Sequence, residues 1–146
     1  MTQSVVHSDA LAPHCLDGMR ILMADDSADN RRLVDRFVRH VGGLVDLVEN
    51  GRDAVTQAQA ADYDLVLMDL QMPVMDGYEA VRQLRQAGFA RPILALTASA
   101  RNEDQGACIA VGFDGLLTKP FERTMLYAAI LRLVQRAAPR ARDAVG

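Results

Sequence analysis

Residues 64–77 read Asp-Leu-Val-Leu-Met-Asp-Leu-Gln-Met-Pro-Val-Met-Asp-Gly, and this stretch decides the fold. Its first part is an apolar run that ends in the carboxylate of Asp69. A short apolar run bounded by polar residues is typical of a buried strand. From Gly77 to Ala87 the pattern becomes helical, and Gly88 ends it. The stretch therefore predicts a buried strand, a loop and a helix in succession.

The same alternation extends in both directions along the chain. Further strands are predicted at 20–24, 44–48, 93–97 and 116–117, and further helices at 28–41, 54–61, 101–111 and 121–136. The first helix has Ser27 or Asp26 as its candidate cap. In the first and last predicted helices, the apolar residues are spaced so that they share one face, which we expect to point inward. They are Leu33, Val34, Phe37, Val38 and Val41 in the first helix, and Phe121, Met125, Leu126, Ala129, Ile130 and Leu133 in the last.

Strands that alternate with helices predict an α/β domain with a parallel sheet. Continuously apolar strands indicate a sheet covered by helices on both faces. Right-handed crossovers then place the carboxyl ends of all strands along one edge, where open sheets bind their ligands. We expect one domain over residues 19–136, between a flexible arm at 1–18 and a frayed tail at 137–146.

Composition narrows the range of functions. The net charge of −3 gives no basic footprint, so we expect no direct binding of nucleic acid. No apolar run is long enough to span a bilayer, and the N-terminus lacks the basic start and apolar stretch of a signal peptide. Cys15 and Cys108 have no metal-like spacing and are interpreted as free thiols. The expected location is the reducing cytoplasm.

The residues that follow the predicted strands form a chemically coherent set. Asp25 and Asp26 follow the first strand, Asp69 the third and Thr97 the fourth, while Thr118, Lys119 and Pro120 follow the fifth. Three carboxylates together repel one another unless a cation lies among them, and an all-oxygen site of this kind suits Mg²⁺. A carboxylate can attack phosphorus and form an acyl phosphate, a reaction that needs in-line positioning and neutralised oxygens.

Each residue alone has a simpler interpretation. Asp25 and Asp26 can cap a helix, and Asp69 can be a solvated loop residue. Thr97 can be an ordinary β-branched strand residue, and Pro120 can simply begin the last helix and leave Lys119 exposed. The site hypothesis depends on all of them lying at one sheet edge.

The chain resembles the receiver domains of two-component response regulators over residues 19–136. The resemblance rests on Asp25-Asp26, on residues 66–77, on Leu-Thr-Ala at 96–98 and on Leu-Thr-Lys-Pro-Phe at 117–121. It implies a flavodoxin-like doubly wound sheet of five parallel strands in the order 2-1-3-4-5. It also implies a phosphoacceptor signalling domain rather than an enzyme, one that assists its own phosphorylation and dephosphorylation.

The resemblance also implies a role for each matching position. Asp69 matches the phosphorylated aspartate, with Thr97 as the switch hydroxyl and Lys119 as the cation that pairs with the phosphoryl group. The implied Mg²⁺ ligands are Asp25, Asp26 and Asp69, with the backbone carbonyl of Gln71. The Lys119–Pro120 bond is expected to be cis. The chain departs from the family at Leu116, where an aromatic switch residue is usual, because an aliphatic side chain cannot reproduce the same ring burial.

The implied phosphodonor is a histidine kinase or a histidine phosphotransfer protein, and the implied state is a monomer or a weak dimer through the last helices. The helix at 28–41, with its exposed arginines Arg31 and Arg32, is a hypothetical docking face for the donor; the alternative is that these charges are simply solvated. Two rival functions stay open. A phosphatase with an aspartyl nucleophile needs a second acid two residues beyond it, but the residue at that position is Gln71, which weakens this alternative. An interaction module that never takes phosphate would lack Asp26, Asp69 or Lys119, all of which are present.

Overall fold

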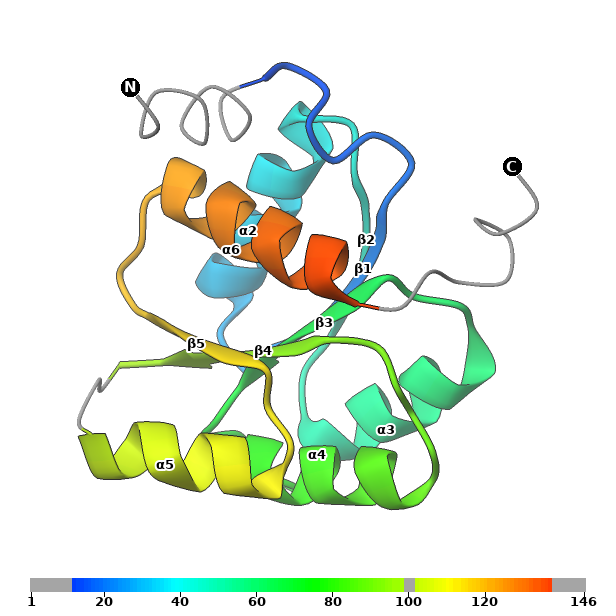
Figure 1. Ribbon diagram of the computed structural model, residues 1–146, viewed down its shortest axis with the longest axis vertical. Coiled ribbons are helices and arrows are strands. Elements are labelled where there is room, and N and C mark those ends of the chain that lie inside the picture. Colours follow the sequence, from blue (N-terminus) through cyan, green and yellow to red (C-terminus); the bar gives the residue numbers. More distant parts are fainter. Residues whose placement is uncertain (1–11, 99–101, 138–146) are drawn as a thin grey trace.

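The computed structural model describes residues 12–98 and 102–137, so residues 1–11 of the expected arm and residues 138–146 of the expected tail lie outside the described residues. In these ranges strands and helices alternate along the chain (Figure 1). The elements are β1 (Arg20–Ala24), α2 (Ala28–His40), β2 (Leu44–Val48), α3 (Gly51–Ala60), β3 (Leu65–Asp69), α4 (Gly77–Gln86), β4 (Ile93–Thr97), α5 (Asn102–Val111), β5 (Gly115–Thr118) and α6 (Arg123–Arg136).

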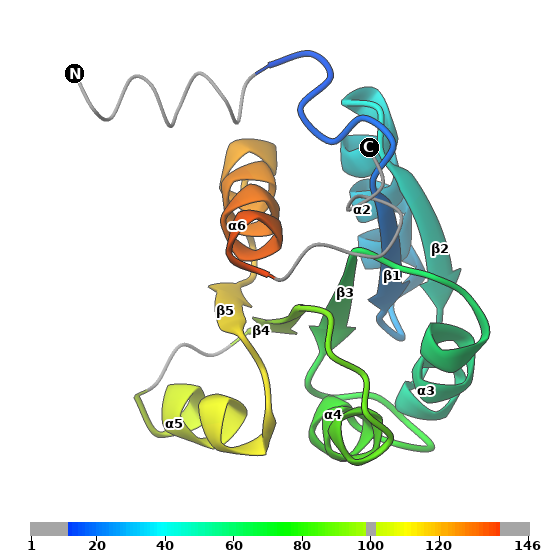
Figure 2. The same cartoon turned by 45° about the vertical axis from the view of Figure 1, so that its right-hand side comes forward.

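The strands form one parallel five-stranded sheet in the order β2-β1-β3-β4-β5. This confirms the predicted fold class and strand order. Figures 1 and 2 show α2 and α6 on one face of the sheet and α3, α4 and α5 on the other. None of the helices in the described parts of the chain combines the length and the apolarity needed for a membrane crossing.

The two faces of the sheet carry separate cores because successive side chains of a strand point to opposite sides. Ile21, Met23, Leu65 and Leu67 pack with the residues of α2 and α6. Their neighbours Leu22, Ala24, Val66 and Met68 pack instead with α3, α4 and α5. Strands β3 and β4 are buried at every position, which explains their continuous apolar sequences.

The helices begin where short polar side chains cap them. Ser27 accepts a hydrogen bond from the Asn30 amide at the start of α2, so of the two candidate caps Ser27 is the one used. Asn50 and Asp76 cap α3 and α4 in the same way. The boundaries differ from the prediction by one to three residues at several ends; α6, for example, begins at Arg123 rather than at 121.

Two inward-facing assignments were wrong. Met125 is half exposed on α6, and Leu33 is 40% exposed on α2. In both helices the apolar residues span a wider arc of the helix surface than the arc that is buried, so residues at the margin of the apolar arc are exposed. Neighbouring positions, such as Val34 and Leu126, are fully buried.

The segment before β1 also differs from the expectation of an arm that extends to residue 18. Leu16 is completely buried and packs in the core between α2 and α6. Its amide donates to the carbonyl of Val41 at 3.1 Å, and the amide of Gly18 donates to that of Gly42 at 3.3 Å. Residues 12–18 are thus attached to the turn between α2 and β2.

Candidate functional site

The parallel sheet brings the predicted site residues together at its carboxyl edge. Carboxylate oxygens of Asp25, Asp26 and Asp69 lie within 4.8 Å of one another. A cleft of about 600 Å³ opens above them, lined by Asp26, Asp69, Gln71, Met72, Pro73, Thr97, Ala98 and Lys119. Residues separated by up to 94 positions in the sequence meet here because every strand ends at the same edge.

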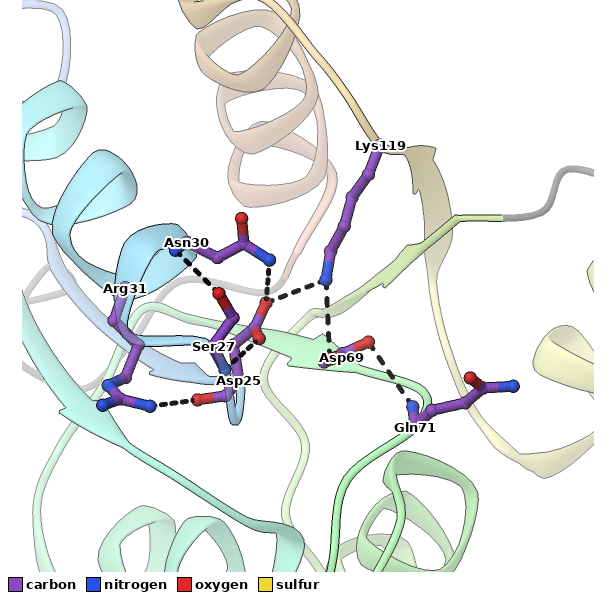
Figure 3. A network of polar contacts seen from close by, with 7 residues as sticks. All are labelled: Asp25, Ser27, Asn30, Arg31, Asp69, Gln71 and Lys119. Carbon is purple, nitrogen blue, oxygen red and sulfur yellow. Dashed lines mark hydrogen bonds and ion pairs between the residues drawn. The ribbon is translucent and has the colours of Figure 1, made fainter.

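Lys119 supplies the positive charge of this site. Its Nζ atom lies 2.9 Å from Oδ2 of Asp25 and 3.4 Å from Oδ2 of Asp69 (Figure 3). The Lys119–Pro120 peptide bond is cis, the geometry that the resemblance implied. The Lys119 amide donates to the carbonyl of Thr97 at 2.7 Å, which attaches the residue after β5 to the end of β4.

The environment of Asp69 disfavours its negative charge. Burial raises the pKa of the Asp69 carboxyl above its usual range, and the nearby charge of Asp25 raises it further. Lys119 and the Gln71 amide oppose this rise only in part. Three carboxylates against one ammonium leave an excess of two negative charges among these side chains. The site is therefore electrostatically suited to a bound cation.

Asp25 is held by donors from three directions. Its Oδ1 accepts from the Ser27 amide at 2.9 Å, and its Oδ2 accepts from Asn30 Nδ2 at 3.3 Å as well as from Lys119 (Figure 3). Sequence reasoning did not assign Asn30 to the site. Its position in the sequence could have indicated this role. Asn30 lies in the first turn of the helix after the two aspartates, and helical side chains tilt toward the N-terminus, here toward Asp25.

A close backbone contact shapes the loop after Asp69. The Gly77 amide donates to the carbonyl of Leu70 at 3.0 Å. A Cβ atom on Gly77 would lie 2.3 Å from the carbonyl oxygen of Asp69, a distance that no side chain tolerates. Only glycine fits at position 77, which allows the loop to close against the end of β3, while Asp76 caps α4.

Thr97 and Leu116 lie on the same face of the sheet. In the register of β4 and β5, Leu116 is paired with Ala95. Paired residues point to the same side of a sheet, and so do residues two positions apart on one strand, such as Ala95 and Thr97. Thr97 lines the cleft, whereas Leu116 packs on the side of α4 and α5. Leu116 also borders a surface hollow of about 270 Å³ together with Cys108, Ile109 and Phe113.

Comparison with known proteins identifies the family. The family model described as the response regulator receiver domain matches residues 21–131. The chain belongs to this family. Receiver domains act in two-component signalling as parts of response regulators and hybrid histidine kinases, and the acidic cleft of this chain is consistent with that activity.

Curated relatives of this receiver domain include both kinds of protein. It is 41% identical to the two-component response regulator ORR41 of Oryza sativa subsp. japonica, over 74% of this chain and 88% of the relative. It is 34% identical to Histidine kinase 1 of Arabidopsis thaliana and to the transcriptional regulatory protein PcoR of Escherichia coli, over 84% of this chain in both cases. The chain spans only 13% and 54% of the lengths of these two proteins.

Solved structures of receiver domains have the same fold. The receiver domain of a Pseudomonas aeruginosa sensor histidine kinase is 38% identical, with a TM-score of 0.75 over 81% of this chain and 98% of that one. That structure is described with a magnesium ion coordinated in its active-site cleft. The chemotaxis protein CheY4 of Vibrio cholerae is 34% identical, with a TM-score of 0.75 over 79% of this chain and 98% of that one.

Proposed function

We propose that this receiver domain accepts a phosphoryl group on Asp69 from a phosphohistidine donor, with the help of Mg²⁺. The observation that carries the proposal is the position of the Asp69 carboxylate in an open cleft, beside Lys119 and two further aspartates. In the reaction an Asp69 oxygen attacks the phosphorus, and the phosphorus–nitrogen bond to the donor imidazole breaks. The electron pair stays on the imidazole nitrogen, and Asp69 becomes an acyl phosphate.

The metal would be held by oxygen atoms. Asp25, Asp26 and Asp69 are hard anionic ligands of the kind that Mg²⁺ prefers, and we assign the backbone carbonyl of Gln71 as a further ligand. When bound, Mg²⁺ neutralises phosphoryl oxygens and so favours transfer. The excess of negative charge around Asp69 supports this assignment, since a divalent cation would offset it.

The remaining residues of the cleft would stabilise the transferred group. The ammonium of Lys119 would pair with a phosphoryl oxygen in place of one of its present carboxylate partners. The Thr97 hydroxyl, at the end of β4, would donate to another oxygen. The domain would thus be an acceptor that assists its own phosphorylation and dephosphorylation.

The donor would be a histidine kinase or a histidine phosphotransfer protein in the cytoplasm, in keeping with the kinases and regulators among the relatives. We place the receiver unit at residues 19–136, with residues 12–18 attached to it through the buried Leu16, and expect a monomer or a weak dimer through the last helices. Exposed Met125 on α6 and Ile109 on α5 are apolar contacts that such a dimer would use.

Mass spectrometry after incubation with acetyl phosphate and Mg²⁺ tests the proposal. We expect an adduct of about 80 Da, the mass of one phosphoryl group, on the wild-type chain and none on Asp69→Asn. Asp76→Asn is the matched control, because it removes a carboxylate from the same loop and still caps α4. An adduct that persists in Asp69→Asn, or its absence from the wild-type chain, would overturn the proposal.

A further inference from the structure

Two consecutive arginines of α2 have different surroundings. The side chain of Arg32 is 69% exposed and pairs with Asp29 on the helix surface. The side chain of Arg31 is only 17% exposed. The prediction that the arginines of this helix are exposed is confirmed for Arg32 and wrong for Arg31. The position of Arg31 therefore needs another explanation.

Arg31 turns back toward the acidic residues after β1. Its NH1 atom donates to the backbone carbonyl of Asp25 at 2.8 Å, as Figure 3 shows. Its NH2 atom lies 3.6 Å from Oε1 of Glu49, the residue after β2. A planar guanidinium can reach two acceptors at once, so Arg31 connects the turn after β1 to the turn after β2.

The carbonyl that Arg31 contacts belongs to the peptide between Asp25 and Asp26. The Asp25 side chain is fixed separately, by Ser27, Asn30 and Lys119. The Asp26 carboxylate is exposed, and within residues 12–98 and 102–137 no hydrogen bond or ion pair to another residue holds it. No such side-chain contact orients it, so the backbone position, which sets the direction of the Cα–Cβ bond of Asp26, is what brings its carboxylate within reach of those of Asp25 and Asp69.

We propose that Arg31 is a positioning residue of the cation site: by holding the Asp25–Asp26 peptide, it directs the Asp26 carboxylate toward Asp69. The inference rests on the proposed function, because it assigns Asp26 to the Mg²⁺ site. Residues behind the direct ligands orient those ligands, and their loss typically lowers metal affinity by about 10-fold to 100-fold. Arg31 acts in this way through a backbone carbonyl.

Mg²⁺ binding is the direct test and does not depend on phosphorylation. Mg²⁺ is titrated into each variant while the backbone amide resonances of residues 25, 26 and 69 are followed by NMR at a temperature where the variant is folded. We expect Arg31→Met to weaken Mg²⁺ binding by about tenfold and Arg32→Met to leave it unchanged. Arg31→Lys is expected to be intermediate, because a lysine can reach the carbonyl but cannot bridge to Glu49 in the same plane.

A second measurement separates positioning from general damage. If Arg31 acts only through the cation, saturating Mg²⁺ restores the labelling rate of Arg31→Met with acetyl phosphate to near that of the wild type. If Arg31→Met does not fold, Arg31→Lys is compared with Arg32→Lys in its place. Equal Mg²⁺ affinity in the wild type and the Arg31 variants would overturn the inference. Normal Mg²⁺ binding without any labelling of the wild type would instead overturn the proposed phosphoryl transfer.

Discussion

At the scale of single residues, the three aspartates at the carboxyl edge of the sheet have different surroundings. Asp25 is fully buried, and both its oxygens accept hydrogen bonds. Asp26 is exposed, whereas Asp69 is buried and lines the cleft. Two of the aspartates, Asp26 and Asp69, line the cleft, and of these two only Asp69 forms an ion pair with Lys119. These surroundings are the reason why we expect Asp69, and not Asp25 or Asp26, to be the nucleophile.

Val74, in the loop beside Asp69, is in a strained conformation. Its φ angle is 68°, in the left-handed region that β-branched residues rarely adopt, and the residue is 75% exposed. Asparagine tolerates this region much better. We therefore expect Val74→Asn to stabilise the protein by about 1 kcal/mol, measured by urea denaturation.

The control for Val74→Asn is Ile109→Asn. Ile109 is similarly exposed, 71%, but lies within α5, where the backbone is helical. Asparagine is a weaker helix former than most residues and gives no relief of strain there, so this variant should be neutral or slightly destabilised. If both variants are stabilised equally, the gain comes from the removal of an exposed apolar side chain and not from the relief of backbone strain at Val74.

At the scale of the elements, apolar runs and their closing carboxylates were enough to predict every strand of the sheet and the edge at which the site forms. In β3 and β4 every position is buried, and the polar residues Asp69 and Thr97 occur only at the carboxyl ends. The same reasoning could not separate Arg31 from Arg32, since a helical pattern gives the side of the helix but not whether a long side chain folds back over its N-terminus. It also missed Gly77, whose role depends on a contact with the backbone of Asp69 that only the folded loop creates.

The segment at 12–18 was the other element that sequence patterns missed, because one apolar residue in a polar stretch has no periodicity to detect. Leu16 is completely buried between α2 and α6. We expect Leu16→Ala to lower the free energy of unfolding by about 2–5 kcal/mol, the usual cost of a cavity in place of a buried leucine. Urea denaturation monitored by circular dichroism measures this loss.

His14→Ala is the control for Leu16→Ala, since the side chain of His14 is exposed in the same segment. Its expected effect is within about 0.5 kcal/mol. A loss below that value for Leu16→Ala would show that the segment contributes little to stability, and the folding unit would then begin at β1.

At the scale of the whole molecule, one face of the sheet extends from the cleft to the surface of α5 and β5. Thr97 borders the cleft, and Leu116 lies on the same face of the sheet one strand away. Leu116 also borders the hollow beside Ile109. Because packed side chains leave few voids, a rotation of Thr97 into the cleft would change the space available to its neighbours on this face. Leu116 would transmit that change by a rotamer shift.

The phosphoryl mimic beryllofluoride tests this connection. With Mg²⁺ present, its binding at Asp69 should shift the amide resonance of Gln71, which lies 3.4 Å from the Asp69 carboxylate. In the wild type we expect the methyl resonances of Leu116 and Ile109 to shift as well. In Thr97→Ala we expect the Gln71 shift to remain and the methyl shifts to be reduced at least several-fold, because the hydroxyl that would move toward the mimic is gone. Undiminished methyl shifts in Thr97→Ala would mean that the surface of α5 and β5 senses Asp69 by a route that does not include Thr97.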